Sequence, residues 1–138
     1  MPWIFENKEV EQLPEDCVGY VYCITNNISG RKYIGKKLSK FSKTTYKVVK
    51  LKNGTKKRKK IRSKVDSDWQ DYYGSSDELK KDVELLGIDK FTREVLKYCK
   101  SKTELSYYEA KYQFDNDVLL DKVKWYNAWI SVKVRRFQ

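Results

Sequence analysis

Residues 18–37 read VGYVYCITNNISGRKYIGKK, and this stretch decides how the chain folds. The run 18–25 is β-branched and aromatic, which favours a strand, and a second strand-like run follows at 31–37. Asparagine, serine and glycine at 26–30 supply a short loop between the two runs. We therefore expect an antiparallel hairpin here.

The segment 44–64 predicts a second hairpin. It reads TTYKVVKLKNGTKKRKKIRSK, in which Asn53-Gly54 fits a type I′ turn between two strand-like runs. Its lysines fall on both faces of such a ribbon, so the segment can bury little surface. It should project from the core, either as a two-stranded ribbon or as a mobile loop.

Two helices and one more strand are predicted downstream. Ser75 and Glu78 have the spacing of a capping box before a helix that Gly87 ends. The run 91–99, FTREVLKYC, predicts a strand, and SKTE at 101–104 repeats the capping pattern before a longer helix.

These elements predict a single α+β domain over residues 1–138. Its small antiparallel sheet should have about three core strands flanked by helices, and residues 38–67 form a basic hairpin or loop insertion. The second helix should run to about Asn116, and segment 122–134 is strand-like or extended. Core positions are expected for three tryptophans, Trp69, Trp125 and Trp129.

The composition restricts the chemistry that the chain can perform. It has no histidine, which excludes imidazole bases, histidine metal ligands and nucleophiles activated by histidine. The net charge is +11, yet residues 31–64 hold 16 basic residues and no acidic one, so the rest of the chain carries −5. Such a localised basic charge is typical of a protein that binds a polyanion. Nucleic acid fits better than a membrane, because the segment lacks an amphipathic helical pattern.

Cysteine usage points to an intracellular protein. Cys17, Cys23 and Cys99 are odd in number and form no CxxC pattern, so we expect buried, reduced thiols. No leader-like or transmembrane-length apolar run is visible, and we expect a soluble, cytoplasmic protein without membrane contact.

The first hairpin resembles the paired-tyrosine hairpin of the GIY-YIG nuclease superfamily. Its second strand holds an intact YIG at 33–35, whereas the first strand has Val21-Tyr22 for the Ile-Tyr pair and Gly19 one place early. The resemblance extends over roughly residues 18–130. It continues in WQDYYGSS at 69–76, Gly87, Phe91, YYEAKYQFDNDVL at 107–119 and Tyr126-Asn127. It points to a phage-encoded, homing-endonuclease-like branch that would act in the host cytoplasm.

The resemblance implies a catalytic set. Tyr22 and Tyr33 match the two motif tyrosines, one of which helps to deprotonate the attacking water. Glu109 matches the glutamate that binds a single divalent ion, Mg²⁺ or Mn²⁺. Asn127 matches a supporting asparagine, and Lys36 matches a frequent lysine near the nucleophile. Tyrosine has an ordinary pKa near 10, so we expect nearby positive charge, such as that of Lys36, to favour the phenolate.

The resemblance also implies a catalytic arginine, normally on the helix that follows the hairpin. The helix predicted over 76–86 contains none, so Arg58 and Arg62 are the nearest candidates. We assign the role to Arg62 because it precedes the WQDYYGSS segment.

Together these features predict a metal-dependent endonuclease that hydrolyses DNA, most readily double-stranded DNA, and leaves a 5′-phosphate. The basic insertion would grip phosphates. There is little room after the catalytic core for a separate DNA-reading module, so specificity would come from this insertion, from a homodimer or from an accessory protein, or else be low. Nucleic-acid contacts are expected from Lys37, Lys40, Lys43, Lys56, Lys57, Arg58, Lys59, Lys60 and Lys64.

A non-catalytic nucleic-acid-binding module fits the same hairpin and basic segment. In that case Tyr22 and Tyr33 would be ordinary cross-strand aromatics and Glu109 a solvated helix residue. The two hypotheses differ in one observable, because catalysis requires Glu109 to lie close to both tyrosines.

Overall fold

The computed structural model describes residues 2–137, apart from the side chains of residues 41–44. The body of the fold consists of β1 (Trp3–Phe5), β2 (Lys8–Glu9), β3 (Gly19–Asn26), β4 (Lys32–Leu38), α1 (Asp77–Leu86), β7 (Phe91–Cys99) and α2 (Lys102–Asp115). Two further strands, β5 (Lys40–Lys50) and β6 (Lys56–Asp66), form a separate two-stranded sheet. Short 3₁₀ turns lie at Trp69–Asp71 and Ile88–Lys90.

The predicted hairpin lies at the centre of the main sheet. β3 pairs antiparallel with β4, placing Tyr22 opposite Gly35, and pairs on its other side with β7. These three strands and the α+β class are confirmed. The sequence does not predict β1 and β2. β1 pairs parallel with β7, so the five-stranded sheet, in the order β2-β1-β7-β3-β4, is mixed and not purely antiparallel.

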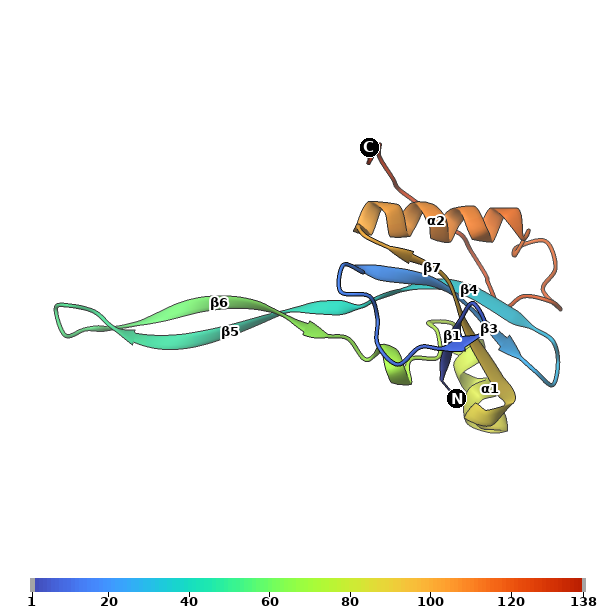
Figure 1. The fold of residues 1–138 in the computed structure, drawn as a ribbon, viewed down its shortest axis with the longest axis horizontal. Helices are drawn as coiled ribbons and strands as arrows, with labels where there is room; N and C mark the ends of the chain where they lie inside the picture. The colour runs from blue at the N-terminus through green and yellow to red at the C-terminus, as the bar shows by residue number, and fades with distance from the viewer. Residues whose placement is uncertain (1, 138) are drawn as a thin grey trace.

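Alternating side chains on β3 build two separate cores. Tyr20, Tyr22 and Ile24 point to the side of α1, where Trp3 and Leu79 are buried with them. The intervening residues of the strands point to the other face, which α2 covers (Figure 1). Along each of β3 and β4, even-numbered and odd-numbered residues therefore point into different cores.

Predictions that single residues lie in the core are met except at Trp129 and, in part, at Cys23. Trp69 and Trp125 are buried, but Trp129 is 77% exposed, so its expected core position is wrong. The three cysteines are free thiols; Cys17 and Cys99 are buried and Cys23 is half-buried.

Serine caps begin both helices. The Ser101 hydroxyl accepts the Glu104 backbone N–H at the start of α2, as the sequence predicts. At α1 the cap is Ser76, whose hydroxyl accepts the Leu79 N–H, and not Ser75. The predicted capping box is therefore wrong by one residue. Because Ser75 does not cap the helix, its hydroxyl is available for a contact within the site described below.

The predicted basic hairpin is a ribbon that extends away from the body of the fold (Figure 1). We call β5 and β6 together the ribbon; each strand has 11 residues, and the register runs without a shift from Lys40 opposite Asp66 to Lys50 opposite Lys56. The predicted type I′ turn is not present. Gly54 has a positive φ of 86° and donates to the Leu51 carbonyl at 2.9 Å, whereas Asn53 is not among the residues with positive φ.

Candidate active site at the edge of the sheet

The site is built on β4, which is the edge strand of the sheet. An edge strand leaves alternate backbone groups unpaired, and these need other partners. Two of the outward N–H groups of β4 belong to Lys32 and Ile34. They donate to the Lys124 carbonyl at 2.9 Å and to the Asn127 side chain at 3.1 Å, respectively.

Two side-chain amides complete the edge at Ile34. Asn127 accepts the Ile34 N–H through Oδ1 and donates through Nδ2 to the Ile34 carbonyl at 2.8 Å, as a neighbouring strand would. Gln113, from α2, donates to the same carbonyl at 2.9 Å. Both amides are buried. Asn127 thus makes the supporting hydrogen bonds that the resemblance implies, and it makes them to the centre of the YIG sequence.

Gly35 allows the two motif tyrosines to lie over the strand. The ring centroids of Tyr22 and Tyr33 are 6.1 Å apart. A Cβ atom at position 35 would lie 2.6 Å from the Tyr22 hydroxyl and 2.8 Å from Cε1 of Tyr33. Only glycine leaves this space open, and it lies on β4, which has no further strand on its outer side.

The two tyrosines differ in access. Tyr22 is fully buried; its hydroxyl lies beside the Tyr72 phenol but forms no hydrogen bond of good geometry among the described residues. Tyr33 is half-buried, and its hydroxyl shares a hydrogen bond of 2.7 Å with the Ser75 hydroxyl. Of the pair, Tyr33 is therefore the one that a substrate can approach.

The expectation that positive charge favours a phenolate is wrong for this structure. Burial raises the pKa of Tyr22 well above its ordinary value, and Tyr72, Tyr33 and Glu109 raise it further. Burial also raises the pKa of Tyr33, against the opposing hydrogen bond from Ser75. Both groups are neutral phenols at neutral pH.

Lys36 points to the other face of the sheet, as its position next to Gly35 requires. Its ammonium group donates to the Ser106 hydroxyl at 2.9 Å and lies 3.9 Å from Oε1 of Glu109. Lys36 therefore lies beside the carboxylate and not beside the two phenols.

Glu109 reaches the edge of β4 from α2. Its side chain is only 15% exposed. Burial raises the pKa of its carboxyl group, and the charge and the backbone N–H of Lys36 oppose this rise only in part. The Glu109 carboxylate lies with Lys36 on the face of β4 opposite the two phenols. It is within electrostatic range of both Tyr22 and Tyr33, whose pKa values it raises.

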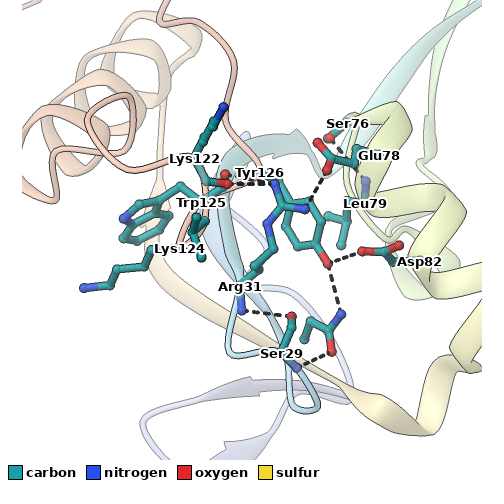
Figure 2. A network of polar contacts seen from close by, with 12 residues as sticks. Ser29, Arg31, Ser76, Glu78, Leu79, Asp82, Lys122, Lys124, Trp125 and Tyr126 are labelled. Carbon is teal, nitrogen blue, oxygen red and sulfur yellow. Dashed lines mark hydrogen bonds and ion pairs between the residues drawn. The ribbon is translucent and has the colours of Figure 1, made fainter.

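A polar network holds the segment that carries Asn127 (Figure 2). Arg31 donates to Glu78 on α1 at 2.6 Å and to the backbone carbonyls of Lys122 at 3.0 Å and Trp125 at 3.3 Å. Its guanidinium group also lies 4.2 Å from the ring centroid of Tyr126. One arginine thus joins α1 to the C-terminal segment.

Tyr126 adds a second connection in the same network. Its hydroxyl donates to Asp82 on α1 at 2.6 Å and accepts from the Asn26 side chain at 3.0 Å (Figure 2). Its backbone N–H donates to the Lys32 carbonyl at 2.8 Å. Residue 126 is thereby fixed on three sides, which places Asn127 opposite Ile34.

Two predicted residues lie elsewhere. Arg62 is on β6, opposite Thr44 in the exposed ribbon, so the structure does not bring it to the cluster around Gly35 (Figure 1). Lys37 is buried and pairs with Asp68 at 2.5 Å, with Tyr72 beneath its ammonium group, so it is not available to a nucleic acid. Both expectations are corrected on geometric grounds.

The other residues expected to contact a nucleic acid all lie in one part of the fold. The Lys43 side chain lies outside the described residues. The remaining members are exposed, and all of them belong to the ribbon: Lys40, Lys56, Lys57, Arg58, Lys59, Lys60 and Lys64.

Several site residues carry no signal in the sequence that identifies them. Ser75, Ser106 and Gln113 contact Tyr33, Lys36 and Ile34 across 42, 70 and 79 positions of sequence. Serine and glutamine at such separations are indistinguishable from surface residues until the fold brings them together.

Two further features are absent from the described part of the chain. Among the described residues no group of three or more histidine, cysteine, aspartate or glutamate side chains could hold a metal ion. No helix in the described part of the chain is both long and apolar enough to span a membrane.

The comparison with known proteins agrees with this geometry. The model of a family described as "Putative endonuclease segE, GIY-YIG domain" matches residues 3–130, which include the hairpin, both helices and Asn127. No curated protein and no solved structure shows a significant match to the chain. Because the match covers nearly the whole chain, the protein belongs to the SegE family of GIY-YIG domains, within the GIY-YIG nuclease superfamily.

Proposed function

We propose that the protein is a metal-dependent DNA endonuclease that hydrolyses phosphodiester bonds at the edge of β4. One observation carries this proposal. Tyr33 lies over Gly35 on one face of β4, the Lys36–Glu109 pair lies on the other face, and that strand leads through Ser39 into the basic ribbon. A cross-strand tyrosine pair with a purely structural role would not need a buried carboxylate beside it.

Glu109 has the character of a metal ligand. Its side chain is mostly buried and its nearest described cation, the Lys36 ammonium group, is 3.9 Å away, so oxygen lone pairs remain for another partner. Mg²⁺ binds in many sites through one or two carboxylates together with water and substrate phosphate. A single carboxylate is therefore a sufficient protein ligand, and a bound Mg²⁺ or Mn²⁺ would neutralise charge on the phosphoryl oxygens and the leaving oxygen.

The neighbouring side chains would orient the reactants. The Tyr33 oxygen, held by Ser75, would accept a hydrogen bond from the attacking water as a neutral phenol. Lys36 would place its positive charge near the phosphate, while Ser106 fixes its direction. In-line attack on phosphorus would leave a 5′-phosphate and a 3′-hydroxyl.

The ribbon would supply most of the affinity. Its exposed basic side chains can neutralise several phosphates, and the release of counterions makes such binding fall steeply with salt. Double-stranded DNA is the substrate that we propose. Specificity beyond the ribbon would come from a homodimer or an accessory protein.

The test is cleavage of supercoiled plasmid in Mg²⁺ or in EDTA. Wild-type protein should nick or cut only with Mg²⁺, and Glu109→Ala should lose almost all activity because the metal ligand is gone. Asp115→Ala is the matched control, since it removes an exposed carboxylate from the same helix. Tyr33→Phe should be strongly impaired and the exposed Tyr107→Phe should not. Undiminished cutting by Glu109→Ala would reject the assignment and leave the non-catalytic binding module.

A further inference from the structure

The ribbon presents two chemically different faces. Side chains alternate along each strand, and directly opposed residues of an antiparallel pair share a face. The unshifted register therefore assigns every residue of the ribbon to one side. Among the described side chains, the arginine face comprises Lys40, Tyr46, Val48 and Lys50 on β5 with Lys56, Arg58, Lys60, Arg62, Lys64 and Asp66 on β6. The lysine face comprises Thr45, Lys47 and Val49 on β5 with Lys57, Lys59, Ile61, Ser63 and Val65 on β6.

Charge is distributed unequally between these faces. Among the described side chains the arginine face has seven basic residues, including both arginines of the ribbon, and one acidic residue, Asp66, whereas the lysine face has three basic residues with Val49, Ile61 and Val65 between them. Ile61 and Val65 are 37% and 39% exposed. A uniform phosphate clamp needs no such division, so the distribution indicates one preferred contact face.

Arg58 is already oriented for recognition. Its guanidinium group stacks 4.4 Å from the ring centroid of Tyr46 on the neighbouring strand. Stacking restricts the rotation of the side chain, which remains exposed to solvent. A guanidinium fork of this kind matches O6 and N7 of guanine in the major groove.

The spacing along β6 matches the spacing of base pairs. Arg58, Lys60 and Arg62 lie at every second position, and therefore about 6.6 Å apart on one face. Two base-pair steps span about 6.8 Å along duplex DNA. Successive side chains of this face can thus meet every second base pair.

The free ribbon also contains repulsion that a polyanion would relieve. Lys50 opposes Lys56, and Lys47 opposes Lys59, in a two-stranded sheet with no further strand. Like charges directly opposite each other destabilise a pair, and isolated two-stranded hairpins are only marginally stable.

We infer that the ribbon enters the major groove of duplex DNA with its arginine face toward the bases, and that Arg58 and Arg62 read base edges there. The inference rests on the proposed function in taking duplex DNA as the partner. A two-stranded ribbon fits the major groove of B-DNA, about 12 Å wide, and not the minor groove, about 6 Å wide. Duplex RNA closes its major groove to side chains and should be excluded.

The first test compares two triple variants that remove equal charge from opposite faces. Arg58→Gln/Lys60→Gln/Arg62→Gln alters the arginine face, and Lys47→Gln/Lys57→Gln/Lys59→Gln alters the lysine face. Binding to a labelled DNA duplex is measured by fluorescence anisotropy in EDTA, with circular dichroism as the folding control. The arginine-face variant should lose at least about tenfold more affinity than its partner, because it loses base contacts as well as charge. Equal losses would overturn the inference.

The second test identifies the groove. Methylation of guanine N7 blocks the major groove, and netropsin occupies the minor groove. N7 methylation should interfere with binding by the wild type, and this interference should disappear in Arg58→Lys/Arg62→Lys, which keeps the charge but loses the bidentate fork. Netropsin should not compete. Competition by netropsin without N7 interference, or equal affinity for duplex RNA, would contradict the assignment.

These measurements do not depend on cleavage. A face-dependent loss of binding together with an uncut plasmid would keep the inference and reject the proposed nuclease activity. Metal-dependent cutting with equal losses in the two triple variants would do the reverse.

Discussion

The smallest residue of the site sets its geometry. Gly35 leaves the volume in which Tyr22 and Tyr33 approach the edge of β4, and a Cβ atom there would lie less than 3 Å from both rings. We predict that Gly35→Ala lowers the free energy of unfolding by about 1–3 kcal/mol through overpacking and impairs cleavage by displacing Tyr33. Gly30→Ala is the control. It has no atom within 4 Å of the new Cβ, so its cost comes from its φ of 79° alone and cleavage should survive. Thermal denaturation and plasmid nicking measure both effects.

Glu109 should lower the free energy of unfolding at neutral pH, a cost that its proposed role as a metal ligand would require. Its folded-state pKa is raised, so the native state binds more protons than the unfolded state just above the ordinary glutamate pKa. Stability at this site therefore falls as pH rises through that window, and the full penalty is present at pH 7. We predict that Glu109→Gln unfolds at an equal or higher temperature than the wild type at pH 7 and is inactive. The wild type should lose activity on acidification at a higher pH than a solvated glutamate would allow. A large loss of stability in Glu109→Gln would show that the charge supports the fold.

Elements that follow local rules could be predicted from the sequence. Hairpin β3–β4, strand β7 and the Ser101 cap depend on neighbouring residues, so their signals are local. β1 could not be predicted, because Trp3–Phe5 is short and pairs with β7 across about ninety residues. The residues of the site also differ in whether a local sequence signal identifies them. The YIG tripeptide identifies Tyr33 and Gly35, but the raised pKa values of Tyr22 and Tyr33 depend on burial that only the packed structure reveals.

At the scale of elements, the C-terminal segment has to be held against β4. Arg31 contacts two carbonyls of that segment and the Tyr126 ring, whereas its ion pair with Glu78 involves a carboxylate that is 60% exposed. We predict that Arg31→Met slows cleavage with little change in DNA affinity, because Asn127 is then less well fixed. Glu78→Gln should cost about 0.5 kcal/mol or less and keep activity, since exposed pairs contribute little. Single-turnover cleavage and anisotropy separate the two readouts. Equal effects of both substitutions would assign the role to the ion pair instead.

At the scale of the molecule, β4 and β5 form one nearly continuous path interrupted only at Ser39 (Figure 1). The ribbon therefore continues the direction of β4 away from the cluster, and it would place a DNA contact at a fixed distance from the proposed site of hydrolysis. From Gly35 the path reaches position 44, opposite Arg62, after about 30 Å, and position 48, opposite Arg58, after about 43 Å. These lengths correspond to about 9–13 base pairs.

We therefore predict that cutting occurs about one helical turn away from the guanines whose N7 methylation interferes with binding. Cleavage mapping at nucleotide resolution and methylation interference on the same duplex measure this offset. A variant in which a two-residue Asn-Gly turn replaces residues 41–65 is the control, because β5 and β6 pair only with each other and the body should fold without them. It should cut weakly at low salt and show no offset pattern. Interference at the base pairs next to the cut would mean that the ribbon folds back over the site, because a straight extension of β4 cannot reach them.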